Sequence, residues 1–112
     1  MGLLELIVTG HWFDMIASGE KTEEYREIKP YWQNRFWCQA SGMCTPKQPC
    51  KAARVRGICD NRYSHVRFHR GYTSTTMKFE IQSINIGSGK PEWGAPTNKE
   101  VYIIKLGKKI EE

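Results

Sequence analysis

The sequence contains no long apolar run, which argues against a membrane-spanning protein. No stretch approaches the roughly 20 apolar residues that a transmembrane helix needs. The apolar segment 3–8 is too short for the core of a signal peptide, and it contains Glu5. Position 6 is Leu, where an N-myristoylation signal has Ser or Thr. We therefore expect a cytoplasmic protein with no membrane partner and with reduced cysteines.

Recognisable metal and cofactor motifs are also missing. The four cysteines are Cys38, Cys44, Cys50 and Cys59. The gaps between them are five, five and eight residues, whereas structural zinc sites use about two to four within a ligand pair. We therefore favour free thiols over a zinc site. A zinc ion bound by Cys44, Cys50 and Cys59 would need His65 or Cys38 as its fourth ligand. Segment 87–91 is rich in glycine but lacks the Gly-Lys-Ser/Thr ending of a P-loop. We expect no metal and no cofactor.

The composition is that of one small basic domain spanning residues 1–112. The chain is 39% apolar and 26% charged, with a net charge of +5 and a pI of about 9.1. Such a charge favours an anionic partner, nucleic acid first, with ordinary surface lysines as the alternative. Residues 38–62 contain five basic side chains against Asp60, a local net charge of +4. We interpret the cysteine-containing segment at about 38–63 as a long loop or insertion that contacts phosphates.

Hydrophobic periodicity predicts an α+β fold, a small mixed β-barrel of about five strands with two short helices. The expected strands are 3–8, 22–26, 65–70, 77–86 and 101–106, and the expected helices are 11–18 and 30–37. Segment 3–8 is almost continuously apolar, as in a central strand covered on both faces. Between 77 and 86 the apolar positions change parity, which predicts a bulge near Ser83. Residues 108–112 look like a polar tail.

The segment from Gly19 to Arg26 does not fit the pattern of an ordinary strand. It holds five charged side chains in eight residues, so it is a candidate functional site. In an extended chain Glu24 and Arg26 share one face, and Tyr25 lies on the other. Glu24 and Arg26 can form a charge-assisted pair and still present donors and acceptors to a ligand.

The spacing Gly19-x-Lys21-x-x-Glu24-x-Arg26 resembles the signature of the ASCH domain, a branch of the PUA-like β-barrels. Segments 91–96 (Pro-Glu-Trp-Gly-Ala-Pro) and 102–107 are similar to the small stand-alone ASCH proteins of bacteria and their phages. The resemblance covers about residues 3–37 and 64–108. It implies a barrel with a cleft bordered by the motif, and it implies binding of RNA, a nucleotide or a nucleoside. We infer no stable protein partner.

Six residues are candidates for nucleic-acid binding. Lys21 and Arg26 would contact phosphate or a base edge, and Glu24 would accept a hydrogen bond from an exocyclic amine. Trp93, or alternatively Trp32, would stack on a base. On strand 65–70, Arg67 and His69 would form a basic outer face beside the Lys21 turn. A purely structural Glu24–Arg26 ion pair is the alternative.

An enzyme is the second possibility implied by the resemblance. One ASCH branch removes the acetyl group from N4-acetylcytidine with a Lys, a Thr and a Glu, and this Lys corresponds to Lys21. The nucleophilic Thr lies three residues after the Lys, where this chain has Glu24. Water activated by Glu24 would then replace covalent acyl transfer. Ribonuclease activity, or binding of another protein, are further alternatives. We expect Lys21→Ala to abolish activity or binding with the fold intact.

Overall fold

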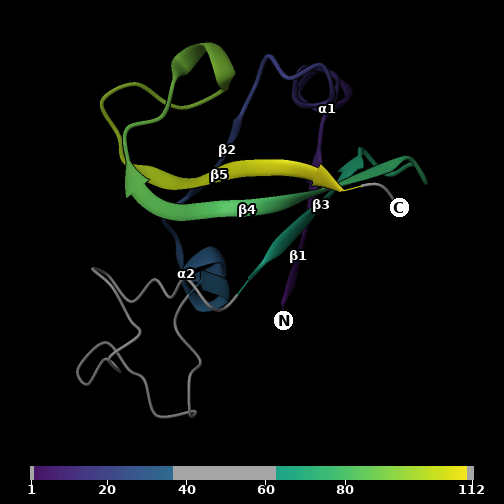
Figure 1. Cartoon of the computed structure of the whole chain (residues 1–112). Coiled ribbons are helices and arrows are strands. Elements are labelled where there is room, and N and C mark those ends of the chain that lie inside the picture. Colours follow the sequence, from purple (N-terminus) through teal and green to yellow (C-terminus); the bar gives the residue numbers. More distant parts are fainter. Residues whose placement is uncertain (1, 37–62, 111–112) are drawn as a thin grey trace.

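A computed structural model of the chain describes residues 2–36 and 63–110, which form one curled five-stranded sheet with two α-helices (Figure 1). The strands are β1 (Leu3–Val8), β2 (Glu23–Glu27), β3 (His65–Arg70), β4 (Thr76–Gly87) and β5 (Val101–Ile110). The helices are α1 (Gly10–Ala17), α2 (Pro30–Phe36) and the short 3₁₀-helix η3 (Pro91–Trp93). The predicted α+β class, the five strands and the two short helices are confirmed. The cysteines and the basic segment at 38–62 lie outside the described residues.

The strand order is β1-β3-β4-β5-β2, with β1 and β3 parallel and the other pairs antiparallel. Strand β4 changes register between Phe79 and Ile81 and again between Ile81 and Ser83, which confirms the predicted bulge. Bulges bend and twist a strand, so β4 and β5 curve together into a half-barrel (Figure 1). The arrangement is compatible with a small barrel.

Strand β1 is an edge strand, so the expectation of a central strand was wrong. Its burial alternates: Leu4, Leu6 and Val8 are buried, whereas Glu5 and Ile7 are exposed. An apolar run shows that a strand has apolar side chains to bury. It does not show whether the strand lies in the centre or at the edge of the sheet. The expected tail was also wrong in part, because β5 runs to Ile110 and pairs with Lys78 on the long strand β4.

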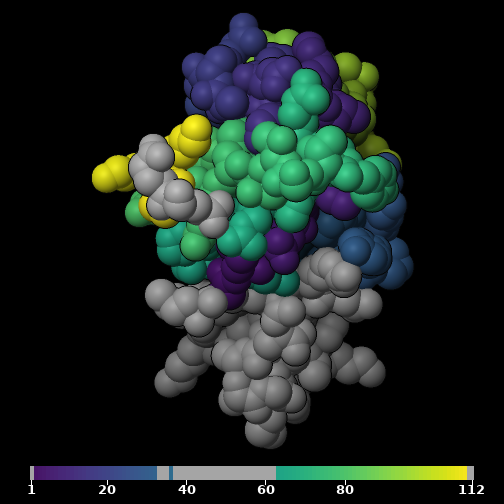
Figure 2. All heavy atoms as spheres, turned by 90° about the vertical axis from the view of Figure 1, so that its right-hand side faces the viewer, coloured from purple at the N-terminus to yellow at the C-terminus, as the bar shows by residue number. Residues whose placement is uncertain are grey.

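The main core cluster lies between the sheet and the two helices. It includes Phe68, Val66 and Ile104, which are fully buried, and α1 contributes Phe13 and Ile16 to it. In Figure 2, α1 and the turn after it (purple to blue) form the top of the molecule, and the teal-to-green β3–β4 hairpin covers the face below. No helix within residues 2–36 or 63–110 is long and apolar enough to cross a membrane.

The turn from α1 to β2 places Lys21. Helix α1 starts after Thr9, whose carbonyl accepts a hydrogen bond from the Phe13 amide although its hydroxyl does not cap the helix. Gly19 has a φ of 85°, a left-handed conformation that favours glycine after a helix. The Lys21 amide then donates to the Met15 carbonyl at 3.0 Å. This hydrogen bond turns the backbone back towards α1, so the Lys21 side chain points into the protein.

Candidate functional site

The candidate site lies at the seam where the half-barrel does not close. The two edge strands, β1 and β2, approach each other there without forming a backbone ladder in the described part of the chain. Instead, Arg26 Nη2 on β2 donates to the Ile7 carbonyl on β1 at 3.1 Å. The Arg26 side chain therefore bridges the seam, and hydrogen-bond donors and acceptors remain on both sides of the seam.

Three charged side chains form a chain of contacts along β2. Lys21 Nζ lies 2.8 Å from Glu24 Oε1, and Glu24 Oε2 lies 3.0 Å from Arg26 Nη2. Lys21 is 2% exposed and Glu24 is 5% exposed. Burying a charge is costly unless it is paired, so the three side chains depend on one another. The predicted common face of Glu24 and Arg26 is confirmed by their contact.

The Lys21 ammonium group is enclosed by the protein. It donates to the Trp93 carbonyl at 2.7 Å, and it lies 4.4 Å from the ring centre of Trp12 and 5.5 Å from that of Tyr25. Cation–π contacts of this kind strengthen when the cation is desolvated. With these contacts Lys21 holds Glu24 and the η3 segment in place and does not face solvent.

A hollow of about 250 Å³ opens beside this network. Its lining includes Glu24, Arg26 and two indole side chains, Trp12 from α1 and Trp93 from η3. Gly94 closes the wall with a φ of 99°, and a Cβ there would lie 3.0 Å from the Trp12 ring. We call this space the tryptophan hollow. It combines flat aromatic side chains with a carboxylate and a guanidinium, which is the chemistry needed to recognise a base.

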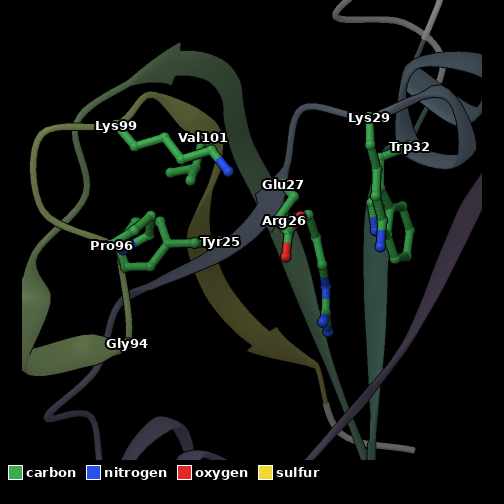
Figure 3. A pocket seen from close by; sticks show the side chains of 9 residues that line it. All are labelled: Tyr25, Arg26, Glu27, Lys29, Trp32, Gly94, Pro96, Lys99 and Val101. Carbon is green, nitrogen blue, oxygen red and sulfur yellow. The ribbon is translucent and has the colours of Figure 1, made fainter.

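A second hollow, of about 440 Å³, is also lined by Arg26 (Figure 3). One wall contains Tyr25, Pro96, Lys99 and Val101, and the opposite wall contains Lys29 and Trp32, with Glu27 and Arg26 between them. We call this space the lysine hollow. The two hollows share three lining residues, Tyr25, Arg26 and Gly94, so they are adjacent.

Arg26 contacts both hollows and is only partly satisfied by the protein. Its guanidinium carbon lies 5.3 Å from the ring centre of Trp32, and its Nη2 contacts Glu24 and the Ile7 carbonyl. Its Nε is buried and has no hydrogen-bond partner among the described residues. A buried donor of this kind is usually satisfied by an ordered water or a ligand.

Tyr25 supports the site from the opposite face of β2. Its hydroxyl donates to Glu23 Oε1 at 2.8 Å and accepts from the Lys90 amide at 3.0 Å. Burial raises the pKa of Tyr25 above its ordinary value, although the Lys90 amide opposes this shift. Gly89 allows this approach, because a Cβ there would lie 2.6 Å from the Tyr25 ring. Tyr25 thus fixes the loop that carries Trp93.

Arg67 and His69 lie apart from this cluster, on the face of β3 opposite to the buried Phe68. Both contact the Glu5 carboxylate on β1: Arg67 Nη1 at 3.4 Å and His69 Nε2 at 2.9 Å from Oε1. The hydrogen bond with His69 lowers the pKa of Glu5. Of the six predicted residues, the structure brings Lys21, Glu24, Arg26 and Trp93 together.

Sequence reasoning did not identify three of the lining residues. Trp12 on α1 is only partly buried and borders the tryptophan hollow. Lys29 and Lys99 lie in segments with no motif, and they meet only through the fold. No group of metal-ligating side chains occurs in the described part of the chain. Comparisons with protein-family models, curated proteins and solved structures gave no match for this chain.

Proposed function

We propose that this protein binds single-stranded RNA or a nucleotide at the seam between β1 and β2, as the resemblance to ASCH and PUA-like domains implies. The observation that carries the proposal is the buried Lys21–Glu24–Arg26 network beside a hollow that contains two tryptophans. A buried network of charges is expensive to maintain, and here it borders an opening instead of the apolar core.

Each lining group has a role in this proposal. Trp93 and Trp12 supply aromatic surface for an unpaired base, an interaction worth about 1–3 kcal/mol per base. Glu24 accepts from an exocyclic amine, and the Arg26 guanidinium contacts a base edge or a sugar. Lys21 holds the Glu24 carboxylate in position, and it holds η3 through the Trp93 carbonyl.

Hydrolysis of a modified nucleoside is the second candidate, favoured by the position of the Glu24 carboxylate. This group borders the tryptophan hollow, where it can activate a water molecule, and its Oε1 contacts Lys21. Thr22 is exposed and lines neither hollow, so its hydroxyl does not replace the missing nucleophile at position 24. Ribonuclease activity remains a prediction that no described contact favours.

The binding proposal is tested with Trp93→Ala and a short single-stranded RNA. This variant removes the indole and keeps the backbone carbonyl that Lys21 needs. We expect about tenfold weaker RNA binding by titration calorimetry, because one stacking contact is lost. Tyr72→Ala is the matched control, since Tyr72 is 95% exposed and lines neither hollow.

Equal affinities of wild type, Trp93→Ala and Tyr72→Ala would contradict the placement of the site. The same proteins, incubated with N4-acetylcytidine and a panel of nucleosides and examined by mass spectrometry, separate binding from hydrolysis. A product made by wild type and not by Glu24→Gln would establish an enzyme. A steep fall of affinity with salt distinguishes an RNA partner from a protein partner.

A further inference from the structure

We infer that the lysine hollow is a phosphate subsite, so that the ligand is a nucleoside phosphate or an RNA strand whose base enters the tryptophan hollow. This inference rests on the proposed function and specifies the ligand class. It assigns Lys29 and Lys99 to binding.

The charges of the lysine hollow favour an anion. Three cationic side chains, Arg26, Lys29 and Lys99, line it against one carboxylate, Glu27. Figure 3 shows Lys99 extending past Val101 towards the middle of the hollow, and Lys29 running beside Trp32 on the opposite wall. Two ammonium groups on facing walls can approach one phosphate from two sides.

Neither lysine has its charge neutralised within residues 2–36 and 63–110. Lys29 and Lys99 are exposed, and the ion pairs of this part of the chain involve other residues. Lys21, by contrast, is fully enclosed and paired with Glu24. The phosphate-contacting role that the motif suggested for Lys21 therefore passes to lysines outside the motif.

The two hollows are arranged for one ligand with an aromatic and an anionic part. Arg26, Tyr25 and Gly94 line both, so a ligand that fills one hollow reaches the border of the other. Arg26 Nη2 is held by Glu24 and by the Ile7 carbonyl, which fixes the guanidinium that lines both hollows. Its Nε remains a donor without a protein partner in the described part of the chain.

The experiment compares a nucleoside with its 5′- and 3′-monophosphates and with a dinucleotide, by calorimetric titration into the full chain. We expect wild type to bind at least one phosphorylated ligand at least tenfold more tightly than the nucleoside. In the Lys29→Gln/Lys99→Gln double variant this preference should fall to less than threefold, with nucleoside affinity unchanged. The ligand that loses most affinity identifies whether a terminal or a bridging phosphate occupies the subsite.

Lys108→Gln/Lys109→Gln is the matched control, since it removes the same charge from exposed positions on β5. Lys109 lies eight residues beyond Val101 along an extended strand, on the order of 25 Å from the lysine hollow. This control should keep the full preference for phosphate. Equal loss in both double variants would overturn the subsite and leave only a general effect of charge.

Failure of the inference and failure of the proposed function give different results. If the nucleoside and its phosphates bind wild type equally, and Trp93→Ala weakens both, the base site stands and the phosphate subsite is wrong. If none of the ligands binds at millimolar concentration, both proposals fall.

Discussion

Lys21 is the residue whose environment differs most from what its sequence neighbours indicate. A lysine in a run of charged residues is ordinarily solvated, yet this one is 2% exposed and contacts Glu24, the Trp93 carbonyl and the Trp12 ring. The sequence alone could not predict this, because two of these partners lie on other elements. The Glu24–Arg26 pair was predictable, since it depends only on alternation along one strand.

Replacement of Lys21 should therefore affect stability as well as function. Lys21→Met keeps the apolar stem and leaves Glu24 with Arg26 alone, so we expect the free energy of unfolding in urea to fall by about 3 kcal/mol. The earlier expectation that Lys21→Ala would leave the fold intact is revised accordingly. The double variant Lys21→Met/Glu24→Gln should lose less free energy of unfolding than the sum of the losses in the two single variants, because it contains no buried carboxylate that lacks a partner.

Lys105→Met is the control for this prediction. Lys105 is exposed on β5, and its replacement should change the free energy of unfolding by no more than about 0.5 kcal/mol. If Lys21→Met proves as stable as Lys105→Met, the buried Lys21–Glu24 pair does not exist in solution.

For the helices and strands, hydrophobic periodicity predicted where the elements occur in the chain better than it predicted their places in the sheet. The alternation of β3 and the change of parity in β4 located a strand and a bulge correctly. The position of β1 was wrong, because a run such as Leu3 to Val8 is also compatible with an edge strand whose outer face carries Glu5 and Ile7. The residues just before α2 and just before β5 line the lysine hollow together because of the order of the strands in the sheet. Hydrophobic periodicity does not specify that order.

The link between β2 and the loop before η3 gives a prediction about pH. In the fold, burial raises the pKa of Tyr25 above its unfolded value of about 10. Unfolding then favours loss of its proton, so the stability that Tyr25 contributes is complete below about pH 10 and declines as the pH rises further. We expect Tyr25→Phe to cost about 1 kcal/mol at neutral pH, through the lost hydrogen bonds to Glu23 and Lys90.

The measurement is the urea midpoint of wild type and Tyr25→Phe between pH 7 and about pH 11. The advantage of wild type should shrink above about pH 10. Tyr72→Phe serves as the control, because an exposed tyrosine should give a curve parallel to wild type. Parallel curves for Tyr25→Phe as well would show that its hydroxyl is not buried in the folded protein.

In the molecule as a whole, the candidate site lies along the seam between β1 and β2. The curled sheet leaves two edges, Arg26 on one edge donates to the Ile7 carbonyl on the other, and both hollows are lined by Arg26. The charge pattern of segment 19–26 and the resemblance to ASCH domains indicated Lys21, Glu24, Arg26 and Trp93, whereas the roles of Trp12, Lys29 and Lys99 became visible only in the fold. Arg67 and His69 on β3, predicted as part of the same surface, contact Glu5 on β1 and line neither hollow.

The most direct test of this seam as the binding site is an NMR titration of the ¹⁵N-labelled protein with a short single-stranded RNA. We expect the indole N–H signals of Trp12 and Trp93 and the backbone amide signal of Arg26 to shift together, in proportion to bound ligand. The β3 amides at Arg67 and His69 should stay unchanged. Shifts confined to β3, or no shifts at saturating RNA, would contradict the account.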